Sequence, residues 1–287
     1  MASGVPYALL TLFCFGLNDL LFKRAAQHGA ASHQIMMVFT LTMVPFFVAF
    51  GVLTQSVVAA PAALWGALGG LFAYYGFYNF SRSLSSGAVS VLSPIFRLQF
   101  VVTAILALAF FGEQLSAAKI GGLALAIAAV WLLLGNGAAG TAVAIPRETI
   151  VRVLLATMAV GIAFFLFKLA LRQGATPATV LLCQVVALSS AATVFSVRRD
   201  RRFTASRAAL RYGIPFGVSQ AIGFAALIVG LAVGEASVLV PIAQLSFVLT
   251  AIVGLTFLKE AVTARRMVGL TAAVGAVALL ALATRLP

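Results

Sequence analysis

The chain has 287 residues, of which 63% are hydrophobic and only 9% are charged, and its mean hydropathy is +1.13. A soluble domain carries about 25% charged residues, so this composition excludes a cytosolic enzyme, a secreted disulfide scaffold and a disordered chain. The formal charge of +13 does not indicate nucleic-acid binding, because the basic residues stand in short tracts between apolar runs, where they orient a membrane protein. Cys14 and Cys183 lie inside apolar runs and are interpreted as buried hydrophobic residues, not as a disulfide or a metal site.

A membrane-spanning helix needs about 20 apolar residues. Ten segments meet this requirement, and in chain order they are 5–24, 34–53, 64–84, 89–111, 120–136, 150–171, 178–197, 211–233, 237–258 and 267–284. The separations at 84–89 and 233–237 are the weakest. A single helix over 64–111 would be about 70 Å long, which exceeds the bilayer, so a turn is required there. The first segment has no basic residue before it and is interpreted as a span, not as a signal peptide.

The two halves of the chain are similar in sequence. Residues 90–106 and 237–253 are identical at 11 of 17 positions, and the same offset aligns Glu113 with Glu260. We predict a first repeat over 1–137, a linker over 138–149 and a second repeat over 150–287. Because five spans is an odd number, the second repeat enters the membrane inverted. Inverted repeats are typical of secondary transporters, whose substrate site lies near the midplane where the repeats meet.

With these features the sequence resembles the EamA-type ten-helix members of the drug/metabolite transporter superfamily. The resemblance is carried by the similar openings of the fourth span of each repeat at 90–95 and 237–242, by the glutamates that end these spans, and by the small-residue spans 120–136 and 267–284. It implies an all-α polytopic fold of two inverted five-helix repeats and transport by alternating access. Members of this kind include exporters of amino acids, some of them aromatic.

The fourth span of each repeat carries polar candidates for a substrate site. Arg97 lies at membrane depth, where a charge normally faces a cavity or a partner, and we interpret it as a cation that attracts a substrate carboxylate. The alternative is a side chain that snorkels to the interface. Its equivalent Gln244 is assigned to the same site. Pro94 and Pro241 free backbone carbonyls and are assigned as hinges. Three other polar residues lie at this depth, and each is interpreted either as a ligand of the substrate or as a helix–helix hydrogen-bond partner: Gln99, Gln220 and Ser246.

The first and third spans supply the remaining candidates. Asn18 is assigned to the substrate site. Asp19 is either the partner of Lys23, four residues on along the same helix face, or the group that couples transport to a proton or cation. In the third span, three residues are assigned to an aromatic cavity wall with hydroxyl and amide groups, although tyrosines also form belts at the membrane interface: Tyr75, Tyr78 and Asn79.

These patterns predict a secondary transporter that exports small metabolites, with amino acids of aromatic or other apolar character as the favoured substrates. The alternatives are a transporter of another organic solute or drug and, from a different class, a passive channel or a membrane enzyme. The sequence has no H-E-x-x-H zinc motif and no P-loop, so we expect no enzyme, no primary pump, no cofactor and no metal. The expected partners are a small-molecule substrate and the lipid bilayer, and we expect the chain to function as a monomer.

The basic residues also predict an orientation. The odd-numbered connections between spans carry 14 Lys and Arg residues, whereas the even-numbered connections and the C-terminus carry 4. Because basic residues of short loops stay in the cytoplasm, the count predicts a protein of the cell (inner) membrane with both termini outside. The resemblance implies the opposite orientation, with both termini in the cytoplasm.

Overall fold

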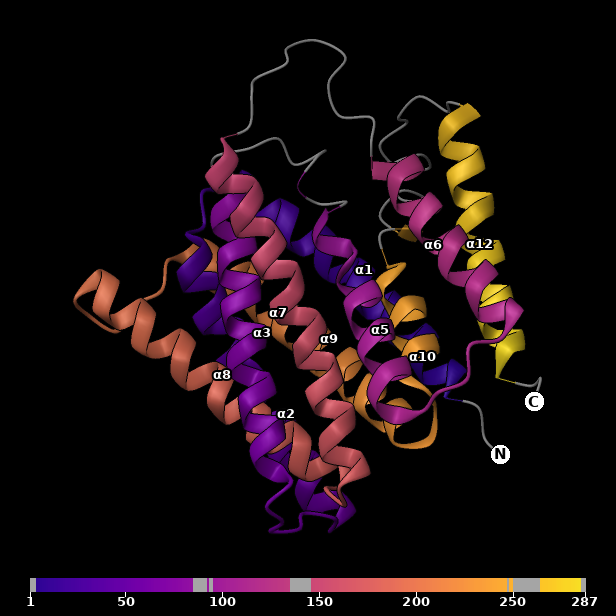
Figure 1. Ribbon diagram of the computed structural model, residues 1–287. Helices are drawn as coiled ribbons and strands as arrows, with labels where there is room; N and C mark the ends of the chain where they lie inside the picture. The colour runs from indigo at the N-terminus through magenta and orange to yellow at the C-terminus, as the bar shows by residue number, and fades with distance from the viewer. Residues whose placement is uncertain are drawn as a thin grey trace.

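The computed structural model describes residues 4–84, 92, 95–134, 146–246, 248–249 and 264–284 (Figure 1). Over these residues the chain forms ten helices and no strand, which confirms the all-α architecture. The helices of the first half are α1 (Val5–Gln27), α2 (Ser32–Thr54), α3 (Ala63–Leu84), α5 (Gln99–Phe111) and α6 (Ala117–Leu134). Those of the second half are α7 (Arg147–Arg172), α8 (Pro177–Asp200), α9 (Arg207–Val233), α10 (Ala236–Gln244) and α12 (Ala264–Ala283).

Several helices have the length and composition of membrane spans. Five are long and apolar enough to cross a bilayer, namely α1, α2, α7, α8 and α9, and shorter apolar helices lie at Ile95–Phe111, Ala117–Leu132 and Met267–Ala283. Each of the ten segments expected from the sequence overlaps one of the ten helices. The chain is therefore a polytopic membrane protein. The helix α7 begins at Arg147, inside the linker predicted over 138–149, and the earlier residues of that linker lie outside the described part of the chain.

The helices are exchanged between the repeats to form two bundles. In the first bundle α3 packs on α7 and α8, and α5 packs on α7; in the second, α9 packs on α1 and α2, and α10 packs on α1. Exchange of the two repeats converts the packing of α3 on α7 and α8 into that of α9 on α1 and α2, as a pseudo-two-fold axis requires, while the repeat counterparts of α5 and α10 lie largely outside the described residues. The bundles meet where α2 packs on α8 and where α5 packs on α10. The pair α6 and α12 lies side by side at the edge of the molecule opposite α8 (Figure 1).

Glycines allow the closest contacts within each bundle. A Cβ atom on Gly70 of α3 would overlap the backbone of Gln184 in α8, and a Cβ atom on the equivalent Gly217 of α9 would lie 2.7 Å from the carbonyl oxygen of Phe39 in α2. Apolar transmembrane helices gain little from the hydrophobic effect and associate through such close backbone packing. The glycine pattern repeated in both halves is therefore a packing feature.

The fourth span of each repeat is interrupted, whereas the sequence predicted continuous helices over 89–111 and 237–258. Helical residues 95–97 are followed by a turn at Leu98, and α10 ends at a turn at Leu245. In both turns the amide is bonded three residues back: the Leu98 N–H donates to the Ile95 carbonyl at 3.1 Å, and the Leu245 N–H donates to the Ile242 carbonyl at 3.2 Å. The two turns are related by the repeat offset, so the interruption belongs to the fold and not to one half.

The proline assigned as a hinge in the second half lies within α10, four residues before its turn. Pro241 is fully packed among its neighbours, and its carbonyl accepts from the Leu245 N–H at 3.2 Å. The hinge assigned to Pro94 falls outside the described residues. A hinge role for both prolines stays a prediction.

Candidate functional site

The two interrupted helices meet through a reciprocal pair of hydrogen bonds. Arg97 Nη1 donates to Ser246 Oγ at 3.0 Å, and Gln99 Nε2 donates to Gln244 Oε1 at 2.6 Å. The repeat offset exchanges Arg97 with Gln244 and Gln99 with Ser246, so each bond is the pseudo-symmetric copy of the other. The polar residues of the two fourth spans thus lie on the pseudo-two-fold axis, between the bundles.

Asp19 completes this arrangement from α1. Its carboxylate Oδ2 forms an ion pair with Arg97 Nη2. The sequence offered Lys23, four positions on, as its partner; the side chain of Lys23 lies outside the described part of the chain, and the partner that the structure shows is Arg97 of the other bundle. The side chains of Asp19 and Arg97 remain 32% and 15% accessible, whereas Gln99 and Gln244 are each 2% exposed. The ion pair is therefore the accessible part of an otherwise buried polar layer.

Unsatisfied hydrogen-bonding atoms surround the ion pair. Asn18 Nδ2 donates to Gln220 Oε1 of α9 at 2.5 Å, but the buried Oδ1 of Asn18 has no partner among the described residues. The Oε1 atom of Gln99 is also buried and has no partner among the described residues. Buried acceptors without a donor are costly. A ligand or a water that donates hydrogen bonds is thus favoured here.

The structure does not bring the α3 candidates together with Arg97. Phe77 and Phe80 point toward the fourth span, where their rings lie 5.8 and 3.9 Å from the ring of Phe96. Tyr75 lies on the opposite face of the helix, as the period of 3.6 residues requires, and is 48% exposed. Asn79, on the same face, donates to the Tyr75 carbonyl at 2.8 Å. The assignment of these two residues to the substrate site stays a prediction.

Tyr78 occupies a third direction, toward α8. Its ring lies 4.5 Å from the ring of Phe195 and stacks on Tyr74 at 6.0 Å. It contributes to helix packing between α3 and α8. Its assignment to the cavity wall stays a prediction.

Charged side chains tie the two bundles together at one end of the molecule. Glu113, which follows α5, is 7% exposed, and its two carboxylate oxygens accept from the backbone N–H groups of Ala236 and Ser237 at 2.9 and 3.0 Å. These are free N–H groups of the first turn of α10, where the helix dipole also favours a negative charge. Beside them Lys119 Nζ pairs with Glu235 at 2.7 Å.

Lys168 of α7 forms the matching contact at the end of α9. Its Nζ donates to the carbonyls of Leu231 and Gly234 at 2.5 and 2.6 Å, where α9 leaves its last carbonyls unbonded. A cation is favoured at a helix C-terminus. Glu113 and Lys168 come from one bundle and cap helices of the other, so this end is held closed by two helix caps and an ion pair.

The sequence supplies part of the signal for these caps. Glu113 and Lys168 each have a counterpart in the other repeat, at Glu260 and Lys23. Glu113 is buried although it stands at the end of a span. Glu260 and the side chain of Lys23 lie outside what the structure describes.

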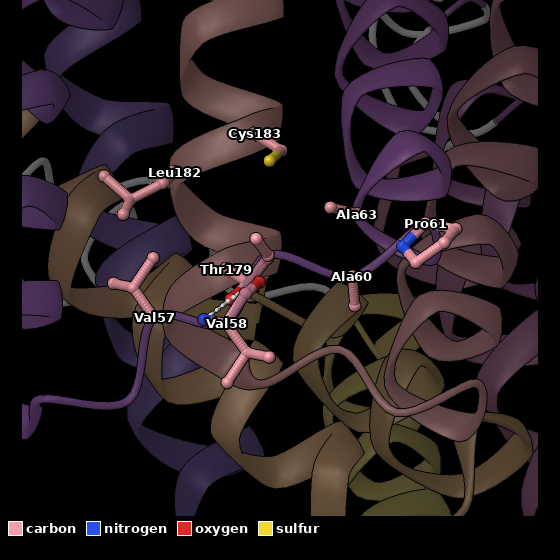
Figure 2. A pocket seen from close by; sticks show the side chains of 9 residues that line it. Val57, Val58, Ala60, Pro61, Ala63, Thr179, Leu182 and Cys183 are labelled. Carbon is pink, nitrogen blue, oxygen red and sulfur yellow. Dashed lines mark hydrogen bonds between the residues drawn. The ribbon is translucent and has the colours of Figure 1, made fainter.

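A separate groove of about 450 Å³ lies between the α2–α3 connection and the start of α8 (Figure 2). Its walls are apolar apart from Thr179 and Cys183. The Thr179 hydroxyl is already occupied, since it accepts from the Val58 N–H at 2.9 Å and donates to the Val58 carbonyl at 3.1 Å. The groove thus offers no charged side chain to orient a polar solute.

Comparison with known proteins agrees with this architecture. The sequence model of the EamA-like transporter family matches residues 2–135 and 148–282, one match for each half. A solved crystal structure of a protein superposes with a TM-score of 0.81 over 99% of this chain and 100% of that chain, at 16% sequence identity, which shows a shared fold. A search of curated proteins finds no match. Since the family match covers both halves almost completely, the chain belongs to the EamA-like transporter family.

Proposed function

We propose that this chain, which as a member of the EamA-like family is a membrane transporter of small solutes, is a secondary transporter that exports amino acids with aromatic or other apolar side chains by alternating access. The observation that carries the proposal is the accessible Asp19–Arg97 ion pair at the two helix interruptions, between bundles related by pseudo-symmetry.

An ion pair of this kind fits both charges of a zwitterion. The guanidinium of Arg97 binds a carboxylate through two parallel hydrogen bonds, and the carboxylate of Asp19 accepts from an ammonium group. Hydrogen bonds to charged groups contribute about 1.5–3 kcal/mol each, enough to select an amino acid over analogues that lack one charge.

The surroundings favour an apolar side chain on the substrate. Phe15 lies one turn before Asp19, and its ring is 6.3 Å from Phe224, which in turn is 6.1 Å from Phe164. Phe164 stands in the second repeat where Asp19 stands in the first. Aromatic rings, two of them from the second repeat, thus lie next to the charged groups of the site.

Alternating access follows from the two-bundle arrangement. The caps made by Glu113 and Lys168 hold one end closed, and release of these contacts lets the bundles rock about the central site. The charge count places this end on the outer side of the cell membrane, with both chain termini. A monomer contains both bundles and the whole site, so we propose a functional monomer without enzymatic activity.

The test is competition for uptake of labelled L-phenylalanine into proteoliposomes. Unlabelled phenylalanine should compete at least tenfold better than 3-phenylpropionate, which lacks the ammonium group, and than phenethylamine, which lacks the carboxylate. Arg97→Ala should lose uptake yet remain monodisperse, and Asp19→Asn should lose the discrimination against 3-phenylpropionate. The control Arg147→Ala, at an exposed position at the start of α7, should behave as wild type. Equal competition by all three compounds, or full uptake by Arg97→Ala, would refute the assignment.

A further inference from the structure

The connection between α8 and α9 carries a dense cluster of arginines that the transport site does not use. Residues 198–211 hold six arginines and one acidic residue, Asp200, a formal charge of +5. All six arginines are exposed: Arg198, Arg199, Arg201, Arg202, Arg207 and Arg211. We name this set the arginine loop.

The one acidic side chain of the loop is bonded to α2. Asp200 accepts from Gln34 Nε2 at 2.8 Å and pairs with His33 Nε2 at 2.9 Å, both at the start of α2. Within the described part of the chain, no ion pair involves any of the six arginines. Their charge is therefore left for a partner outside the chain.

The loop is also held in a fixed shape. Gln34 bonds to both sides of the turn between α8 and α9, because its Nε2 donates to Asp200 and its Oε1 accepts from the Ser206 N–H at 3.0 Å. Ser206 then caps α9, with its Oγ accepting from the Ala209 N–H at 3.1 Å. Arg201 adopts a left-handed conformation, with φ of 57°, that ends α8. Arginines on a pinned turn lose less freedom on binding than arginines on a free tail.

The position of the loop selects the partner. The helix α8 has 24 residues, about 36 Å, which exceeds the hydrocarbon core of about 30 Å and sets its end among the lipid headgroups. Beside the arginines Phe203 is 67% exposed, and aromatic side chains prefer this interfacial depth. Guanidinium groups bind phosphate through two hydrogen bonds. We propose that the arginine loop is a binding site for the headgroups of anionic phospholipids in the surrounding bilayer.

The test is native mass spectrometry of the full-length protein in detergent with added phosphatidylglycerol or phosphatidylcholine. Wild type should retain phosphatidylglycerol in preference to phosphatidylcholine. In the double variant Arg201→Gln/Arg202→Gln the affinity for phosphatidylglycerol should fall about tenfold to thirtyfold, since each basic residue near an anionic surface has an effect of roughly fivefold. The control Arg147→Gln/Arg152→Gln removes the same charge on the same side of the membrane and should retain wild-type binding.

Three results would overturn the proposal. They are equal retention of the two lipids, an equal loss in both double variants, and full competition by inorganic phosphate at the lipid concentration, which would indicate a site for free anions. Transport in pure phosphatidylcholine liposomes is measured in parallel. Its absence in wild type would count against the proposed transport function and would leave the lipid-binding result intact.

Discussion

Replacement of Glu113 by glutamine should open the end of the molecule that its carboxylate holds closed. In wild type the carboxylate accepts two backbone hydrogen bonds from the first turn of α10, at 2.9 and 3.0 Å, in a site where its side chain is 7% exposed. Glutamine has nearly the same size. Its oxygen retains one of these bonds, but its NH2 group faces the other backbone N–H, donor against donor.

The expected magnitude follows from the lost bond. A hydrogen bond to a charged group contributes about 1.5–3 kcal/mol. That range corresponds to a shift of roughly tenfold to 150-fold in the equilibrium between the closed and open forms of this end. The loss of the favourable interaction between the carboxylate and the α10 dipole acts in the same direction.

Cysteine labelling measures this opening directly. Ser237 is fully buried and its hydroxyl has no partner among the described residues, so Ser237→Cys introduces a thiol reporter at little cost. In a background with Cys14 and Cys183 replaced by alanine, a water-soluble maleimide should label this thiol at least tenfold faster in Glu113→Gln than in the parent. The control is Glu148→Gln, which alters an exposed glutamate in the first turn of α7. Equal labelling rates in the three proteins would refute the reasoning.

Three further predictions address packing, coupling and orientation. Gly70→Ala places a Cβ against the Gln184 backbone and should destabilise the protein by about 1–3 kcal/mol in thermal unfolding. The control Gly121→Ala meets only the flexible end of Leu279 and should leave stability unchanged. Equal stability of the two variants would contradict the packing. If Asp19 couples transport to protons, Asp19→Asn should exchange substrate but no longer concentrate it against a gradient, and continued concentration would dismiss that role. A fluorescent reporter that matures only in the cytoplasm, fused after Pro287, should stay dark, and bright cells would reverse the orientation taken from the basic residues.

The sequence was sufficient for the architecture because the relevant signals are local and repeated. Apolar length and intervening turn residues identify each helix, and the offset between 90–106 and 237–253 identifies the two repeats. Polar residues at membrane depth also indicated the central layer, since Arg97 and Gln244 have few alternatives in an apolar environment. The hydrogen-bond partners within this layer depend on which helices meet, and the tertiary fold decides that.

Three particular features show where local reasoning fails. Asp19 pairs with Arg97 because the packing of α1 on α10 brings the fourth spans beside it, a contact between distant segments that spacing along α1 does not reveal. The rotation of α3 is set by the packing of Phe77 and Phe80 against Phe96, and spacing within α3 alone does not reveal which of its faces meets the fourth span. The interruptions at Leu98 and Leu245 involve ordinary apolar residues.

Counterflow tests the central claim, that the two bundles carry a zwitterion between them by alternating access. Proteoliposomes are loaded with millimolar unlabelled phenylalanine and diluted into micromolar labelled phenylalanine. A carrier that alternates between its two orientations exchanges internal unlabelled substrate for external labelled substrate. Labelled substrate should therefore rise transiently inside to well above its external concentration and then fall, with no rise for Arg97→Ala. A monotonic approach to equal concentrations, as through a continuous pore, would contradict the account.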